Sequence, residues 1–223
     1  MKFADIYGHN EVKERLRQMA DSGRLPHAIL LEGPAGSAKF ALARAFAQYI
    51  HCTNRTADGD SCGVCAACRQ HESFNHIDTV YSFPVVKKSG RPAISDDYID
   101  TFREFMAKYP YMDFDRWLEA LENINAQPQI YVEEGNELLR RLTFMARQSK
   151  FKVVLLWLPE RFKDETANKL LKLIEEPFGD TIFIMVSNNS RAILPTIYSR
   201  TQRVAVRRYD DAELAAILRG RGI

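Results

Sequence analysis

Apolar runs and amphipathic segments alternate along this chain. Three nearly continuous apolar runs, at residues 29–31, 151–158 and 181–187, are typical of strands that are buried on both faces. Each run is followed by a segment whose apolar residues recur at helical spacing. Shorter strands are predicted at 129–132 and 203–206. Strands that alternate with helices predict an α/β protein, a three-layer sandwich with a parallel sheet between helical layers.

The first apolar run leads into a glycine loop and then into a helix. Gly33 and Gly36 interrupt the run, and Lys39 stands at the start of the helical pattern. This is the layout of a P-loop, in which backbone N–H groups and a helix N-terminus hold phosphates and a lysine reaches the outer ones. The loop departs from the G-x-x-x-x-G-K-[ST] pattern twice, because Ala38 replaces a glycine and Phe40 replaces the hydroxyl residue that holds magnesium.

The strand at 151–158 also lacks the groups that a magnesium site needs. In a P-loop ATPase, the strand beside the P-loop strand ends in acidic residues that hold the magnesium shell and polarise water. Here the strand ends in Trp157 and Leu158, and neither residue ligates a metal. Glu160 is acidic but lies beyond Pro159, so it is a disfavoured replacement. We therefore expect a vestigial, empty phosphate loop at Gly33, Gly36 and Lys39, with neither ATP nor magnesium.

All four cysteines lie close together, with the spacing C-x9-C-x2-C-x2-C: Cys52, Cys62, Cys65 and Cys68. Four thiolates at this spacing suit tetrahedral zinc, and Gly59 and Gly63 would ease the turns between them. Because the protein would supply every ligand, the site is predicted to be structural rather than catalytic. Disulfides or free thiols are the alternatives, and a reducing compartment disfavours disulfides. The neighbouring histidines are expected at the surface: His51, His71 and His76.

Residues 77–128 give the weakest pattern. Proline and glycine between residues 84 and 92 predict a loop. Apolar residues at helical spacing then predict two helices, one that contains Phe102 and one that contains Trp117. We expect the aromatic residues here to pack in a core rather than to form a partner surface.

Composition sets limits without indicating a function. The 223 residues carry a formal net charge of +2, which gives no global argument for binding nucleic acid or a membrane. No apolar run approaches the roughly 20 residues that span a bilayer. The start of the chain has no apolar signal segment, so we expect a cytoplasmic protein.

Taken in order, these segments resemble the bacterial DNA polymerase III clamp loader, an AAA+ assembly. The resemblance rests on the glycine loop, the cysteine module directly after its helix, the segment NKLLKLIEEP at 168–177, and the pair Ser199 and Arg200. It covers most of residues 1–76 and 129–223.

The resemblance implies a division of the chain. Residues 1–208 would form an AAA+ P-loop-like domain that contains the zinc module at 52–68 and a divergent, helical insertion at 77–128. Residues 209–223 would form the first helix of a helical lid domain whose remainder lies outside this sequence. An isolated terminal helix buries its apolar face poorly, which supports this expectation.

The resemblance also implies a role. Motor subunits of this family keep an intact P-loop and an acidic pair, and this chain resembles the non-hydrolysing kind that lacks both. Arg200, with Ser199 before it, would be an arginine finger offered to the ATP of a neighbouring subunit. A guanidinium can stabilise a transferring phosphate without a metal of its own. The implied partners are the motor ATPase subunits and delta, with the sliding clamp and primed DNA reached through the assembly, and no membrane.

Two other functions remain open from the residues. The chain could be a motor-type ATPase with unusual metal ligands, in which Gly36 and Lys39 bind phosphate and Asn188 senses it. Alternatively, the cysteine module could bind DNA through three flanking side chains: Arg55, Arg69 and His71. The charge around that module is sparse, which disfavours the second alternative.

Overall fold

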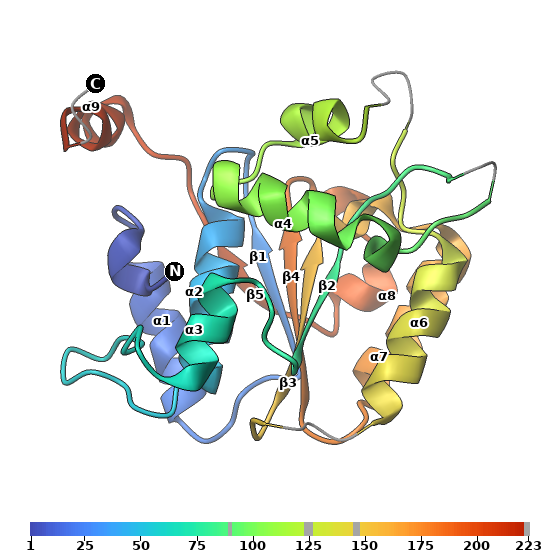
Figure 1. The fold of residues 1–223 in the computed structure, drawn as a ribbon, viewed down its shortest axis with the longest axis horizontal. Helices are drawn as coiled ribbons and strands as arrows, with labels where there is room; N and C mark the ends of the chain where they lie inside the picture. Colours follow the sequence, from blue (N-terminus) through green and yellow to red (C-terminus); the bar gives the residue numbers. More distant parts are fainter. Residues whose placement is uncertain (89–90, 123–126, 145–147, 221–223) are drawn as a thin grey trace.

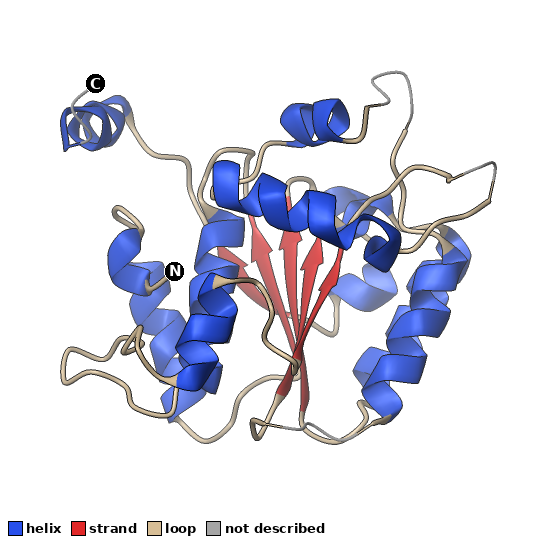
Figure 2. Ribbon diagram, viewed as in Figure 1, coloured by secondary structure: helices blue, strands red, loops and turns tan. Residues whose placement is uncertain are grey.

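One parallel sheet organises the computed structural model, which describes residues 1–88, 91–122, 127–144 and 148–220. Within these residues the strand order is β2-β3-β4-β1-β5, and every neighbouring pair is parallel (Figures 1 and 2). The strands are β1 (Ala28–Glu32), β2 (Thr79–Ser82), β3 (Lys152–Trp157), β4 (Thr181–Ser187) and β5 (Gln202–Ala205). The apolar runs predicted the three long central strands correctly.

Helices lie on both sides of the sheet (Figure 1). The first group consists of α1 (Asn10–Asp21), α2 (Lys39–His51), α3 (Ala66–Glu72), α4 (Ile99–Lys108) and α5 (Phe114–Ala120). The other side carries α6 (Val132–Thr143), α7 (Asp164–Glu175) and α8 (Pro195–Tyr198). Short 3₁₀ turns lie at Phe3–Asp5, Ser95–Tyr98, Pro159–Arg161 and Ser190–Ala192.

Two hydrophobic cores form because successive side chains of a strand point to opposite faces. Ile29 and Leu31 pack with α2 in the first core, whereas Leu30 packs with α6 and α7 in the second. Helix α2 is buried along nearly its whole length, and alanines at every second position from Ala41 to Ala47 leave room for close packing. The three-layer α/β sandwich predicted from the sequence is confirmed.

The segment 77–128 is more closely joined to the domain than the sequence indicated. It begins with β2, one of the two edge strands of the sheet, which the apolar pattern did not predict. The two expected helices are present as α4 and α5, and their aromatic side chains belong to the first core. The strand expected at 129–132 is absent from the sheet, because Gln129 and Ile130 make only isolated bridges before α6 begins.

The last described element is α9 (Asp211–Gly220), which lies apart from the sheet (Figure 1). Tyr209 anchors the approach to α9, since its hydroxyl donates a hydrogen bond to the Tyr7 carbonyl at 2.9 Å. Leu214 and Leu218 are exposed, as expected of a helix with an uncovered face. Residues 221–223 of the predicted lid segment lie outside the described residues, and the division at residue 208 stays a prediction.

No helix in the described ranges has the length and apolar character needed to cross a membrane.

Candidate functional site

The glycine loop joins the carboxyl end of β1 to α2. Gly33 is required by packing, because a Cβ atom there would lie 2.0 Å from the Val206 carbonyl oxygen. Gly36 adopts a φ of +77°, which glycine allows without strain. Ala38 adopts a left-handed φ of +59° although it carries a methyl group. A left-handed backbone conformation, which glycine adopts without strain, therefore occurs at the position where the sequence departs from the P-loop pattern.

Lys39 is directed onto its own loop. Its ammonium donates hydrogen bonds to the Pro34 carbonyl and, at 3.0 Å, to the Ser37 hydroxyl. The side chain is buried, and burial lowers the pKa of Lys39 to about 8, although the nearby Glu160 carboxylate acts in the opposite direction. Lys39, which fits the P-loop pattern, is thus already hydrogen-bonded to its own loop.

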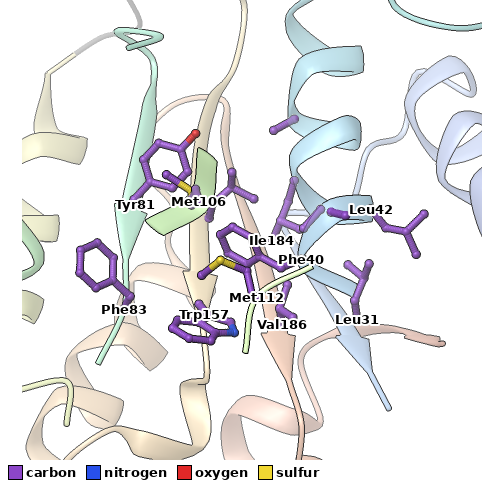
Figure 3. Packing of buried hydrophobic residues seen from close by; sticks show 14 of the residues in the cluster. Leu31, Phe40, Leu42, Tyr81, Phe83, Met106, Met112, Trp157, Ile184 and Val186 are labelled. Carbon is purple, nitrogen blue, oxygen red and sulfur yellow. The ribbon is translucent and has the colours of Figure 1, made fainter. Parts of the chain in front are cut away.

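Aromatic side chains fill the space on one side of the loop, between α2 and β3, whereas a hollow of about 730 Å³ borders Gly33 and Pro34. Phe40 contacts Trp157 with their ring centroids 6.2 Å apart, and Met112 lies against both (Figure 3). The space left between these side chains, Lys39 and Asn188 is about 10 Å³. That volume is at the lower limit for a single water molecule. Phe40 and Trp157, the two positions where the sequence lacks metal ligands, are therefore close together in the fold. Their packing leaves no room for a metal ion between them.

The segment 77–128 completes this packing. Phe102 and Phe105 from α4 lie with their ring centroids 6.1 and 6.3 Å from that of Trp157. Trp117 from α5 lies 6.4 Å from the same ring, and its indole N–H donates a 2.8 Å hydrogen bond to the Pro84 carbonyl. Tilted and edge-on aromatic contacts at these distances are favourable. The role of this segment, and of Met112 in particular, could not be read from the sequence because it depends on long-range contacts.

Glu160 has a different neighbourhood from the one expected. The strand β3 does not lie beside β1, because β4 separates them in the sheet. One carboxylate oxygen of Glu160 accepts hydrogen bonds from the main-chain N–H groups of Asn188 at 2.9 Å and Asn189 at 3.1 Å. Glu160 therefore stabilises the turn after β4, and the Asn188 side chain lines the filled space rather than an open phosphate site.

The four cysteines converge as the spacing predicted. Their sulfur atoms all lie within 4.8 Å of one another. Cys62 Sγ is 3.7 Å from Cys52 Sγ and 3.9 Å from Cys68 Sγ. A tetrahedron with Zn–S bonds of about 2.3 Å has edges of about 3.8 Å. The thiols therefore fit a four-coordinate metal such as zinc.

Two helix ends and two glycine turns bring the thiols together. Cys52 follows the last residue of α2, Cys65 precedes α3 and Cys68 lies in the first turn of α3. Gly59 and Gly63 adopt φ values of +69° and +76°, which confirms their predicted use in the turns. Main-chain N–H groups of Val64 and Cys65 donate hydrogen bonds to Cys62 Sγ and lower the pKa of that thiol.

The expectation of surface histidines was wrong. His51, His71 and His76 are 3, 4 and 3% exposed. Burial lowers the pKa of His51 to about 3 and also lowers the pKa values of the other two. The helical spacing of Cys68 and His71 places both on one side of α3, so the histidine turns inward with the buried thiol.

Arg200 lies after α8 and is partly exposed. Its Nε atom is 2.7 Å from a carboxylate oxygen of Glu175, and both side chains are about two-fifths exposed (43 and 40%). Its Nη1 donates a 3.0 Å hydrogen bond to the Thr196 carbonyl and lies 3.5 Å from the Ser199 hydroxyl. A hollow of about 540 Å³ borders this group. No sequence pattern indicated that Glu175 orients the guanidinium.

The arginine and the glycine loop lie at opposite ends of the sheet. Arg200 precedes the first residue of β5, and the same hollow is lined by Pro26 and His27, which precede β1. The glycine loop follows the last residue of β1. Five strand residues of about 3.3 Å each separate the two ends by about 16 Å. Arg200 therefore cannot reach a phosphate held in its own loop.

The side chains predicted to bind DNA around the cysteine module are mostly engaged elsewhere. Arg55 pairs with Asp21 at 2.5 Å and lies over the Tyr49 ring at 4.0 Å. His71 is buried, and Arg69 is exposed. These three residues do not form a continuous basic surface.

The sheet order, the glycine loop after β1 and the helix that follows define an α/β fold of the AAA+ kind. A solved DNA polymerase III gamma subunit-related protein from Thermotoga maritima shares this fold, with a TM-score of 0.54 and 14% identity. The similarity covers 93% of this chain and 49% of that one. A family model described as "DNA polymerase III, delta subunit" matches residues 8–210. The chain belongs to this family. The family includes the delta' and gamma/tau subunits of DNA polymerase III.

Two relatives illustrate the range of the family. The DNA polymerase III subunit delta' of Pseudomonas aeruginosa is 30% identical over 197 residues, which make up 88% of this chain and 47% of that protein. The subunit gamma/tau of Mycobacterium bovis is 26% identical over 216 residues, 97% of this chain and 30% of that protein. The chain thus spans less than half the length of either relative.

Proposed function

We propose that this chain acts as a non-hydrolysing, delta'-type subunit of a DNA polymerase III clamp loader and supplies Arg200 to the ATP site of a neighbouring subunit. The observation that carries the proposal is the filled space between Phe40 and Trp157. Phe40 and Trp157 occupy the positions of the lost metal ligands, and they leave about 10 Å³ between them and their neighbours. A magnesium ion and its oxygen ligands do not fit there.

The surroundings of Arg200 support a role in trans. The arginine lies at the end of the sheet remote from its own loop, and Glu175 and Thr196 orient its guanidinium. The side chain is 43% exposed, so the guanidinium is accessible to a phosphate of a neighbouring subunit. A rigid donor placed where negative charge develops is what an arginine finger requires. Such fingers raise phosphoryl-transfer rates by about 10³–10⁵.

The proposed partners follow from the family. They are the motor ATPase subunits and delta, with which this chain would help to place a sliding clamp on primed DNA. The thiol cluster would hold one structural zinc ion that fixes α3 against α2. The motor-type alternative is disfavoured because Lys39 and Glu160 are both held by the loops around them. The DNA-binding alternative is disfavoured because Arg55 is paired and His71 is buried.

The test uses the full-length protein reconstituted with the other loader subunits of its organism. We expect Arg200→Ala to abolish ATP turnover at the one interface that it serves, and to lower clamp loading onto primed DNA at least tenfold. Arg200→Lys would not restore the rate, because lysine lacks the planar fork of donors. The readouts are clamp-stimulated ATP hydrolysis and clamp loading.

Arg191→Ala is the matched control. Arg191 is also exposed, but it follows β4 at the other end of the sheet. It should leave both readouts unchanged, and both variants should assemble normally. If Arg200→Ala matched the wild type in hydrolysis and loading, the proposed role of Arg200 would be wrong.

A further inference from the structure

Three buried imidazole rings form a cluster next to the thiols but separate from them. His51 comes from the last turn of α2, His71 from α3, and His76 from the loop that leads to β2. The His76 ring is stacked against the other two, with its centroid 4.1 Å from that of His51 at an interplanar angle of 14° and 4.6 Å from that of His71 at 27°. Because imidazole lone pairs lie in the ring plane, the His76 ring must tilt out of this stack to share an ion with the other two. One nitrogen from each ring lies within 4.8 Å of the others. Three elements thus bring three potential ligands to one point.

The rings have the chemistry of neutral ligands. Imidazolium cations would be costly at this depth, because burial disfavours the charged form and three like charges would repel one another. A neutral imidazole has one nitrogen that donates and one with a free lone pair. Each ring in the cluster can therefore offer one lone pair.

The hydrogen bonds of His51 fix which nitrogen faces the cluster. Its Nε2–H donates to the Phe151 carbonyl at 3.0 Å, so its Nδ1 carries the lone pair. That Nδ1 lies 2.8 Å from His71 Nε2 and 3.5 Å from the Thr79 hydroxyl. Histidines that ligate metals commonly donate the other ring N–H to a carbonyl in this way. The ligand nitrogen of His51 is thus already oriented.

The structure assigns a second metal site to His51, His71 and His76, which together bind a single divalent ion of the zinc class. Imidazole nitrogens suit zinc, copper, iron and nickel. In the absence of an ion, His71 Nε2–H donates a hydrogen bond to His51 Nδ1. When an ion binds, that proton moves to His71 Nδ1 and the ion takes its place. The two ligand atoms then separate from 2.8 Å to about 3.4 Å, the edge of a tetrahedron with Zn–N bonds of about 2.1 Å.

His76 completes the set at a small cost in hydrogen bonding. Its Nδ1 accepts a long, 3.2 Å hydrogen bond from the Asp78 main-chain N–H, and its Nε2 lies 3.5 Å from the Ser149 hydroxyl. Nδ1 therefore carries the lone pair of His76, and an ion bound there replaces the hydrogen bond from Asp78 while Nε2–H stays directed at Ser149. The Thr79 hydroxyl or a water molecule is available for the fourth position. The ion would fasten the end of α2 to α3 and to the start of β2.

The test counts metal ions bound to the full-length protein. Apoprotein is loaded with Co²⁺, dialysed, and measured by elemental analysis and by visible absorption. We expect two equivalents in the wild type. Cys62→Ser/Cys65→Ser should retain one equivalent, with visible bands but without sulfur-to-cobalt charge transfer. His71→Gln should also retain one equivalent, with charge transfer intact. The exposed His27→Gln serves as the matched control and should bind two.

Two results would contradict the second metal site. A single equivalent in the wild type, or a folded Cys62→Ser/Cys65→Ser variant that binds no Co²⁺, would overturn the assignment and leave a hydrogen-bonded histidine cluster. If His71→Gln does not fold, His76→Gln replaces it. X-ray absorption of the cysteine variant then decides independently, because only the proposed site gives a cobalt ion with nitrogen or oxygen neighbours and no sulfur.

Discussion

At the scale of single residues, Phe40 packs in the core at a position where the P-loop pattern has a hydroxyl residue. A threonine or serine at this position would offer an oxygen to magnesium, whereas the phenyl ring is 2% exposed and packs against Trp157 and Phe102. The ring now belongs to the core that joins α2, β3 and α4. Restoring a metal ligand here would open a hole in that core, because the surrounding side chains are already close-packed.

This packing predicts the effect of removing the ring. Phe40→Ala should lower the free energy of unfolding by about 3–5 kcal/mol, the usual cost of truncating a buried phenylalanine. Phe144→Ala is the matched control, since Phe144 is 58% exposed, and it should change the stability by no more than about 0.5 kcal/mol. Urea denaturation followed by circular dichroism measures both. Equal, small effects of the two substitutions would show that Phe40 is not part of a packed core.

Single residues also show which features could not be predicted from the sequence alone. The four cysteines could be assigned to one site because thiols at such short spacing in a reducing compartment are typical of metal ligands. The three histidines were misplaced because burial of a polar ring depends on partners that are far away in sequence, such as Phe151. Glu175 was missed for the same reason, as its ion pair with Arg200 joins α7 to the segment before β5.

At the scale of elements, the cysteine module holds α3 against the end of α2. Its loop is further tied to the N-terminus, because the Asp60 carboxylate accepts hydrogen bonds from the main-chain N–H groups of Phe3 and Ala4. Helix α3 has only seven residues. A helix this short is unstable without tertiary contacts. The metal held by the thiols is therefore expected to stabilise α3.

The module predicts a local response to loss of the metal. Cys62→Ser should remove the zinc ion held by the thiols and raise amide hydrogen exchange in α3 at least tenfold, while β1 and β4 remain protected. Val64→Ser is the matched control, because Val64 lies in the same loop and is 63% exposed. Hydrogen exchange read by mass spectrometry separates the two variants. Unchanged exchange in α3 after zinc loss would contradict a structural role for the metal.

The sequence predicted the elements that carry a strong periodic signal and missed those set by their neighbours. The apolar runs of β3 and β4 are long and buried at every residue, so their pattern was unambiguous. β2 has four residues and only half of them are buried, which leaves no comparable pattern. The helices α4 and α5 were predicted from spacing, but their contact with the glycine loop through Trp157 depends on the tertiary structure.

At the scale of the whole molecule, the two ends of the sheet differ in chemistry. The carboxyl end of β1 holds a glycine loop whose lysine is hydrogen-bonded within the loop, and aromatic side chains fill its side toward β3. The amino end of β5 presents an oriented, partly exposed arginine. A subunit built in this way would contribute to a neighbour's chemistry while performing none at its own loop.

The measurement that tests this account most directly is a calorimetric titration of the full-length protein with ATP, with and without magnesium, beside an intact motor subunit of the same loader. The account predicts that the motor subunit binds ATP tightly in a magnesium-dependent manner. It predicts that this protein shows either no binding or weak binding that magnesium does not change. Tight, magnesium-dependent binding would contradict the closed loop and would point to Glu160 as the replacement ligand.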